Sequence, residues 1–280
     1  CGNAGTLIRL ISGILAGQSF PTVLEGSEQL RRRPMKRIVE PLARMGAAIE
    51  ATNGCAPLNI RPAALRGITH TLPIASAQVK SAILLAGLFA EGETVIEEPG
   101  PSRDHTERML RSMGAPLAVD GLTVRVTGGD HHLQPFDLTV PGDPSSAAFL
   151  IVAAACLPGS DVMLHNICIN PTRTGVIDIM RRMGAEITIE DEIEQSGEPV
   201  ATLRVHGGAL RGVTISGDDV VRAIDELPIL AIAATQAEGE TVIRDAQELR
   251  VKEVDRISVV AGEMRKLDAQ VEEQPDGMII

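Results

Sequence analysis

The chain repeats a pattern in which a run of small apolar residues leads through glycine into a short β-branched stretch. Each copy pairs one run with the stretch that follows it: residues 82–88 with 94–96, 146–153 with 162–164, 229–233 with 241–243 and, more weakly, 7–11 with 22–24. The longer runs are apolar on every side, so each predicts a helix inside the protein rather than on its surface. The β-branched stretches predict strands.

A second pattern follows each of these pairs. A short helix is predicted to end in Met-Gly-Ala at residues 45–47, 113–115 and 183–185, with residues 266–269 as a degenerate fourth copy. Glycine at this place supplies the left-handed conformation that ends a helix, and alternating residues at 122–126 and 186–189 then predict strands. The chain therefore contains four units of roughly 70 residues, longer than solenoid repeats, and each is predicted to be a small α/β layer.

Residues 139–144 separate the first two units from the last two. Two prolines and Gly142 end a strand there, and Asp143 or Ser145 can cap the helix that follows. We expect an α/β (α+β) protein with two domains, residues 1–141 and 142–280, and a hinge near residues 140–144. A chain of 280 residues is long enough for two domains of ordinary size.

Composition narrows the range of partners. Four Phe and no Trp or Tyr leave an aliphatic core and no aromatic platform for single-stranded nucleic acid. The net charge of −11 also argues against nucleic acid, although a few Arg and Lys can dominate one cleft. No apolar run reaches the length of a membrane span. The four Cys lie far apart, which predicts neither a metal site nor disulfides, so we expect a cytoplasmic protein without membrane contact.

The candidate chemistry lies in runs of unusual composition. Residues 248–256, ELRVKEVDR, hold six charged residues in nine positions. Residues 1–6 form a Gly-rich turn before a helix that carries Arg9, and residues 31–33 are three consecutive Arg before Pro34. Residues 75–81 and 102–108 begin two further helices with polar groups. Arg, Lys and helix N-termini of this kind bind phosphates and carboxylates.

Each run also has an ordinary structural explanation. Charged runs form solvated helix surfaces, Pro34 suits the first position of a helix, and Ser76 and Asp104 suit N-caps. Residues 102–108 and 248–256 occupy the same point of the repeat, the predicted start of the second helix in units two and four. We therefore predict that both runs line an anion-binding cleft.

Eight motifs resemble, in the same order, those of the 5-enolpyruvylshikimate-3-phosphate synthases. They are GNAGT with Arg9 (residues 2–9), LRRRPM (30–35), ASAQVKS (75–81), SRDHTERML (102–110), PGDPSSAAF (141–149), NPTRTG (170–175), DELPILA (225–231) and ELRVKEVDR (248–256). Any one of them is weak, but eight in register along the chain are specific. The resemblance implies the two-domain enolpyruvyl transferase fold, an inside-out α/β barrel of six small units, of which about four are present. We expect this chain to be a piece of a longer protein.

The resemblance also implies a reaction. The family transfers the enolpyruvyl group of phosphoenolpyruvate to the 5-hydroxyl of shikimate 3-phosphate and releases phosphate, on the route to chorismate and aromatic amino acids. It does so by addition and elimination, without a metal or organic cofactor, and we expect a monomer. Two alternatives stay open: the sister transferase acting on UDP-N-acetylglucosamine, which needs a nucleophilic Cys in a mobile loop, and a non-catalytic repeat scaffold.

The family's residue roles carry over to matching positions. Asp225 is the expected base near the 5-hydroxyl, and Glu253 is expected to take part in proton transfer at the phosphoenolpyruvate methylene. The residues expected to bind shikimate 3-phosphate are Ser76, Ala77, Gln78, Arg103, Asp225 and Lys252. The residues expected to bind phosphoenolpyruvate are Gly5, Arg33, Gln78 and Arg256.

This sequence also departs from the family pattern. Val254 stands where the family usually has Ser or Thr, which removes a hydroxyl from the last motif. The family's N-terminal Lys-Ser pair and C-terminal basic groups have no counterpart in residues 1–280, so these residues alone are expected to be inactive. The resemblance also implies that glyphosate, an inhibitor of the family, binds at the phosphoenolpyruvate site. Glycine at position 5 is the residue expected in a glyphosate-sensitive member, because a methyl group there would crowd the inhibitor.

Overall fold

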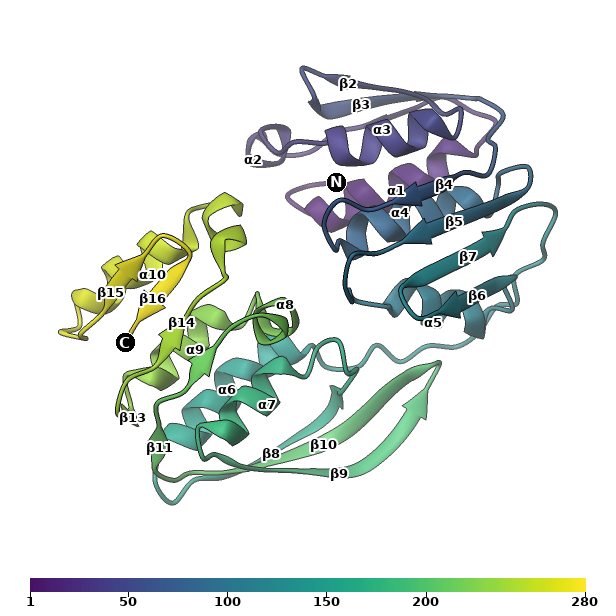
Figure 1. Cartoon of the computed structure of the whole chain (residues 1–280). Helices are drawn as coiled ribbons and strands as arrows, with labels where there is room; N and C mark the ends of the chain where they lie inside the picture. The colour runs from purple at the N-terminus through teal and green to yellow at the C-terminus, as the bar shows by residue number, and fades with distance from the viewer. The chain divides into compact units, whose positions relative to one another are not determined.

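Each of the four repeated units contains a helix, a strand, a second helix and further strands, in that order (Figure 1). The computed structural model describes residues 1–280, which form two compact units, Cys1–Asp137 and Leu138–Ile280. The predicted domain boundary, after residue 141, lies a few residues beyond this division, and the hinge stays a prediction. None of the helices combines the length and apolar character needed to cross a bilayer.

The first compact unit holds two repeats. Its elements are α1 (Gly5–Ala16), β1 (Thr22–Leu24), α2 (Glu28–Arg31), α3 (Lys36–Arg44), β2 (Ala48–Thr52), β3 (Cys55–Arg61), β4 (Thr69–Thr71), α4 (Ala77–Gly87), β5 (Glu93–Glu97), α5 (His105–Ser112), β6 (Leu117–Asp120) and β7 (Thr123–Thr127). They build two sheets, in the strand orders β1-β3-β2 and β4-β5-β7-β6. Helices α1, α3 and α4 pack on one another between these sheets (Figure 1).

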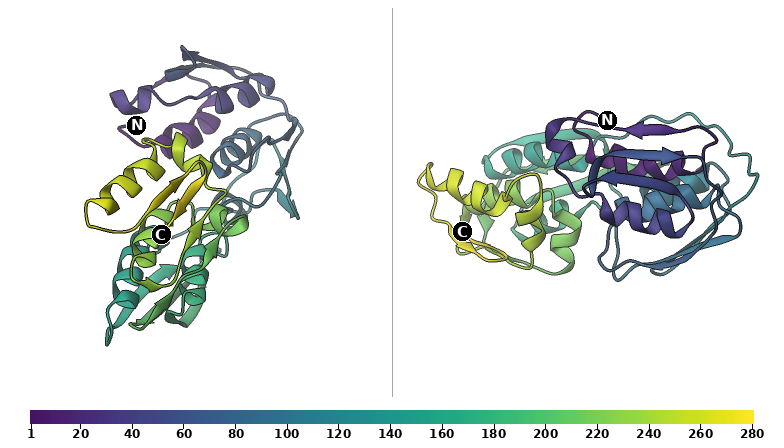
Figure 2. Two further views of the ribbon diagram at one scale, coloured as in Figure 1. Left: turned by 60° about the vertical axis from the view of Figure 1, so that its left-hand side comes forward. Right: turned by 90° about the horizontal axis from the view of Figure 1, so that it is seen from above.

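The second compact unit holds the other two repeats. Its elements are α6 (Pro144–Cys156), β8 (Asp161–Cys168), α7 (Gly175–Arg182), β9 (Glu186–Gln195), β10 (Glu198–His206), β11 (Leu210–Arg211), β12 (Thr214–Ile215), α8 (Asp218–Ala223), α9 (Leu227–Ala234), β13 (Ala237–Glu238), β14 (Val242–Ile243), the 3₁₀ helix η1 (Gln247–Val251), α10 (Arg256–Arg265), β15 (Glu272–Gln274) and β16 (Gly277–Ile279). Its larger sheets have the orders β8-β10-β9 and β12-β14-β16-β15. Helix α10 packs on the hairpin β15–β16, the yellow end of the chain in Figure 2.

Two of the apolar helices connect parallel strands. Helix α4 lies between the parallel partners β4 and β5, and α9 lies between the parallel partners β12 and β14. Such a crossover helix covers a sheet and is itself covered, so it needs an apolar surface on most sides. Every residue of α4 from Val79 onward is buried, as the sequence predicts.

The prediction of an interior position is wrong for parts of two other helices. Phe149 and Leu150 of α6 are 62% and 55% exposed, and Leu7 of α1 is 47% exposed. Other elements of the chain cover only one side of these helices, so apolar composition alone overstates their burial.

The helix ends follow the Met-Gly-Ala pattern closely. Gly46, Gly114 and Gly184 have positive φ angles of 98°, 75° and 103°, and Asp268 takes the same place in the fourth unit with φ 62°. In each copy the following alanine donates its N–H to the carbonyl five residues back, as Ala47 does to Leu42 over 3.0 Å. This is the Schellman closure, and Asp268 can replace glycine because aspartate tolerates the left-handed region.

Several predicted helix starts need correction. Asp143 caps α6 as predicted, by accepting from Ser145 N at 3.1 Å. Pro34 is not the first residue of α3, because this helix begins at Lys36 and Met35 is its N-cap. Asp104 occupies the N-cap of α5, yet its carboxylate pairs with Arg108 at 2.8 Å.

The run at residues 248–256 is not a helix start. Its first four residues belong to η1, and only Arg256 lies in α10. Asp255 caps that helix in an extended conformation and accepts from Ser258 N at 3.1 Å, so α10 cannot extend back into the residues before it.

Candidate functional site

The first compact unit gathers cationic and polar groups at the start of α1. Gly5 is the first residue of this helix, and a Cβ built on it would lie 2.5 Å from Nη1 of Arg33 and 3.3 Å from Nη1 of Arg9. The helix start and the two guanidinium groups are therefore in direct contact. We call Gly5, Thr6, Arg9, Arg33 and Gln78 the cationic cluster.

Arg9 and Gln78 form the inner part of the cationic cluster. Arg9 is 2% exposed and donates from Nη1 to Oε1 of Gln78 at 2.8 Å, while its Nε is buried without a hydrogen-bond partner. Nε2 of Gln78 donates to Oγ1 of Thr6 at 2.9 Å. Because Arg9 can only donate, it orients the Gln78 amide so that its NH₂ group faces Thr6 at the helix start.

The cationic cluster carries an excess of positive charge. Burial, together with the neighbouring positive charges of Arg37 and Arg33, lowers the pKa of Arg9 to about 10. The other two arginines of the predicted run have partners nearby, since Arg31 pairs with Glu25 and Arg32 with Glu28. Arg33 is thus the arginine of this run that faces the helix start, where an anion is favoured by the helix dipole.

The start of α4 supplies the next predicted residues. Ser76 is the N-cap of α4, but its hydroxyl makes no capping hydrogen bond, and Ala77 is the first residue of the helix. The hydroxyl is therefore available to a ligand at the same helix end. Arg103 is half-buried in the segment just before α5.

A buried ion cluster links α4 to the segment carrying Arg103. Nζ of Lys80 lies 2.7 Å from Oε2 of Glu98 and 2.7 Å from Oε1 of Glu107, and all three side chains are at most 4% exposed. Ser102, next to Arg103, donates to Glu98. Burial raises the pKa of Glu107, although Lys80 opposes this shift. The cluster ties the start of α5 to α4.

The second compact unit brings three predicted residues together. Asp225 lies just before α9, and Arg256 is the first residue of α10. Nη1 of Arg256 lies 3.4 Å from Oδ1 of Asp225, and its Nη2 lies 2.8 Å from Oε1 of Glu253. One guanidinium thus bridges both predicted acid–base groups, an arrangement we call the carboxylate–arginine cluster.

Lys252 lies beside this cluster in the same segment. Its side chain is 20% exposed, and Nζ lies 3.5 Å from Oε1 of Glu248. Val254, the departure from the family pattern, is 48% exposed. A half-exposed side chain at this position contributes little to the core.

The sequence alone assigned no role to Thr6 and Arg9 of the cationic cluster, nor to Arg250, which lies close to Lys252 in the chain. Arg9 had a detectable signal, because it is a charged residue inside an otherwise apolar helix run. Thr6 and Arg250 had none, because their contacts come from distant parts of the chain. No group of three or more His, Cys, Asp or Glu is placed to hold a metal ion.

Comparisons with known proteins agree with this architecture. The structure is similar to "the enolpyruvyl transferase NikO from Streptomyces tendae", with a TM-score of 0.65, 20% identity and coverage of 83% of this chain and 54% of the other. That likeness defines the class of fold, an enolpyruvyl transferase fold. The sequence profile of the EPSP synthase (3-phosphoshikimate 1-carboxyvinyltransferase) family matches residues 1–280. The chain belongs to the EPSP synthase family.

Two family members show how far the likeness extends. The 3-phosphoshikimate 1-carboxyvinyltransferase of Geobacter sulfurreducens is 54% identical over 282 residues, which cover all of this chain and 66% of the relative. The EPSP synthase structure from Acinetobacter baumannii has a TM-score of 0.89 and 49% identity, with coverage of all of this chain and 63% of the other. This chain therefore spans about two thirds of the length of the relatives it matches.

Proposed function

We propose that the protein carrying this chain transfers the enolpyruvyl group of phosphoenolpyruvate to the 5-hydroxyl of shikimate 3-phosphate and releases phosphate. The observation that carries this proposal is the family match over residues 1–280, with about half of the residues identical to those of named transferases. The same match favours this reaction over the sister reaction on UDP-N-acetylglucosamine and over a non-catalytic scaffold.

Phosphoenolpyruvate is assigned to Gly5, Arg33, Gln78 and Arg256. Its phosphate and carboxylate need cations and N–H donors, and a planar guanidinium matches both groups. The excess positive charge of the cationic cluster supports this assignment, as does the position of Gly5 at a helix N-terminus. The buried Arg9 holds Gln78 in an orientation suited to donating.

Shikimate 3-phosphate is assigned to Ser76, Ala77, Gln78, Arg103, Asp225 and Lys252. The unengaged cap hydroxyl of Ser76 and the first N–H groups of α4 suit a phosphate or hydroxyl group of this ligand. Lys252 supplies a flexible cation for the same ligand.

Asp225 and Glu253 are assigned the proton transfers. Asp225 accepts the proton of the 5-hydroxyl while the hydroxyl oxygen forms a bond to C2 of phosphoenolpyruvate. Glu253 protonates the C3 methylene, which gives a tetrahedral intermediate. Glu253 then takes a proton back from the new methyl group, which re-forms the double bond as the bond from C2 to the phosphate oxygen breaks, and the proton held by Asp225 leaves with the released phosphate. The contact of both carboxylates with Arg256 supports this assignment, because a shared cation keeps both near one reacting centre.

Two measurements on the full-length protein test the proposal. Calorimetric titration should show binding of shikimate 3-phosphate, and phosphate release should require both substrates. Asp225→Asn should lower kcat by about 100- to 10,000-fold, the usual contribution of a positioned acid or base. Asp219→Asn, which removes a carboxylate from a surface ion pair with Arg182 in the same compact unit, should leave kcat unchanged. Absence of binding and of phosphate release in the unsubstituted protein would overturn the proposal.

A further inference from the structure

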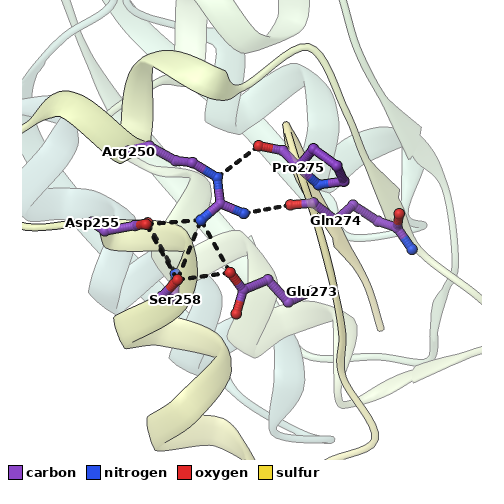
Figure 3. A network of polar contacts seen from close by, with 6 residues as sticks. All are labelled: Arg250, Asp255, Ser258, Glu273, Gln274 and Pro275. Atoms are coloured by element: carbon purple, nitrogen blue, oxygen red, sulfur yellow. Dashed lines mark hydrogen bonds and ion pairs between the residues drawn. The ribbon is translucent and has the colours of Figure 1, made fainter.

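Arg250 is the centre of a polar network in the second compact unit (Figure 3). Its Nε donates to the carbonyl of Pro275 at 2.6 Å, and its Nη2 donates to the carbonyl of Gln274 at 2.6 Å. Its Nη1 reaches Oδ2 of Asp255 at 2.8 Å, Oε1 of Glu273 at 3.0 Å and Oγ of Ser258 at 3.2 Å. Every nitrogen of the guanidinium is therefore engaged.

These contacts close a short segment at its base. Arg250 lies near the end of η1, and Asp255 is the N-cap of α10, so the ion pair between them joins the two ends of residues 251–254. Gln274 and Pro275 lie at the end of β15 and in the turn that leads to β16, so the same guanidinium attaches the segment to this hairpin. The closed segment carries Lys252 and Glu253.

Hydrophobic burial does not hold this segment in place. Val251 is 80% exposed and Val254 is 48% exposed, and the nearest buried apolar side chain before them is Leu249. A segment without apolar anchors depends on its hydrogen bonds to keep one conformation. Lys252 pairs with Glu248, and Glu253 pairs with Nε and Nη2 of Arg256, whereas Arg250 makes five contacts that reach both ends of the segment and the hairpin.

The charges in the network support one another. Hydrogen bonds from the N–H of Ser258 and, to a smaller extent, from Arg250 hold the pKa of Asp255 below its usual range. Hydrogen bonds from the Ser258 hydroxyl and from Arg250 lower the pKa of Glu273 in the same way. Both carboxylates therefore stay ionised and keep accepting from Arg250 at neutral pH. A lysine could not replace it fully, because an ammonium lacks the planar fork that reaches acceptors on two sides.

We propose that Arg250 is a positioning residue that holds Lys252 and Glu253 in their reactive placement. This inference rests on the proposed function. Arg250 acts through the backbone of residues 251–254, and its five contacts all lie within the protein.

The test compares three variants of the full-length protein. Arg250→Met removes the network, and Arg250→Lys keeps the charge but reaches fewer acceptors. Arg265→Met is the matched control, because Arg265 lies at the other end of α10 and donates twice to the carbonyl of Val271, just before β15. The readouts are the thermal midpoint, hydrogen–deuterium exchange of residues 251–255 without substrate, and steady-state phosphate release.

The expected result separates positioning from general destabilisation. Arg250→Met should speed exchange of residues 251–255, raise KM for shikimate 3-phosphate and lower kcat. Its kcat/KM should fall on the order of 100-fold, as for a displacement of reacting groups by about 1 Å. Arg250→Lys should lie in between, and Arg265→Met should keep the unsubstituted exchange rate and kcat/KM at a similar thermal midpoint. If Arg250→Met does not fold, Arg250→Lys and Arg265→Lys carry the same comparison.

Two outcomes would overturn the inference: unchanged exchange of residues 251–255 in the Arg250 variants, or an equal loss of kcat/KM in the Arg250 and Arg265 variants. Failure of the proposed function is a separate result. It would appear as no phosphate release by the unsubstituted protein, and the exchange comparison would still decide whether Arg250 holds the segment.

Discussion

Gly5→Ala is expected to weaken phosphoenolpyruvate binding without weakening the fold. A Cβ at this position would lie 2.5 Å from Nη1 and 3.1 Å from Cζ of Arg33. Ordinary van der Waals contact begins near 3.4 Å, so the guanidinium must retreat by about 0.9 Å. The atoms that move are the end of a flexible side chain, and the thermal midpoint should therefore stay close to that of the unsubstituted protein.

The magnitude follows from what Arg33 is proposed to do. A hydrogen bond to a charged group contributes about 1.5–3 kcal/mol, and its loss corresponds to about 10- to 100-fold in binding. KM for phosphoenolpyruvate should rise by that factor, while KM for shikimate 3-phosphate changes less. Glyphosate, which the family resemblance assigns to the phosphoenolpyruvate site, should inhibit the variant more weakly for the same reason.

Steady-state phosphate release and thermal unfolding of the full-length protein check this prediction. Gly13→Ala in the same helix is the matched control, because its Cβ would lie 2.1 Å from the backbone carbonyl oxygen of Ala82 in α4. A backbone atom between packed helices cannot retreat, so this variant should lose stability. An unchanged KM for phosphoenolpyruvate in Gly5→Ala, or a loss of stability as large as that of Gly13→Ala, would refute the reasoning.

Three further predictions concern stability. Gly262→Ala in α10 should raise the free energy of unfolding in urea by about 0.4–1 kcal/mol, because nothing lies within 4 Å of the new Cβ and a helical glycine is entropically costly. Lys80→Met should lower it by about 3–5 kcal/mol, because Glu98 and Glu107 lose their buried cation. Asp255→Asn should lower the free energy of unfolding at neutral pH, and progressively less below about pH 4. The pKa of Asp255 is lower in the folded state than in the unfolded state. Its carboxylate therefore stabilises the fold fully above the unfolded pKa, and this contribution is lost as pH falls through the folded pKa.

Each of these predictions has its own control. Glu107→Gln keeps the 2.7 Å pair of Lys80 with Glu98, so it should cost less than Lys80→Met, and equal losses would contradict the account. Burial raises the pKa of Glu107, so the pH dependence of this residue is opposite to that of Asp255. Its contribution to the stability of the fold is present at low pH and is lost as pH rises through the raised pKa. A loss in Asp255→Asn that does not depend on pH would show that its carboxylate charge is irrelevant. A lower unfolding free energy for Gly262→Ala would show that α10 tolerates no side chain there.

Local patterns predicted the parts of this fold that depend on short stretches of chain. The Met-Gly-Ala helix ends are an example: a glycine, or Asp268 in its place, takes the left-handed conformation because of its own backbone preference. The order of elements in each repeat follows from apolar periodicity in the same way. The run at residues 248–256 shows the limit of such reasoning. Its charge pattern suits an α-helix, yet only Arg256 lies in one: the residues before the N-cap Asp255 belong to the 3₁₀ helix η1 or to no helix.

The sequence by itself determined the repeated α/β units, the family and the set of candidate residues, because periodicity, turn residues and motifs are all local properties of the chain. Only the tertiary structure decided which of these residues are in contact. It placed Arg33, rather than Arg31 or Arg32, against Gly5, and it joined Asp225 to Glu253 through Arg256. It also assigned Arg250 its five contacts, two of them to carbonyls of the distant hairpin. The physical reason is that these contacts join residues far apart in sequence, so packing of whole elements selects among side chains that look equivalent along the chain.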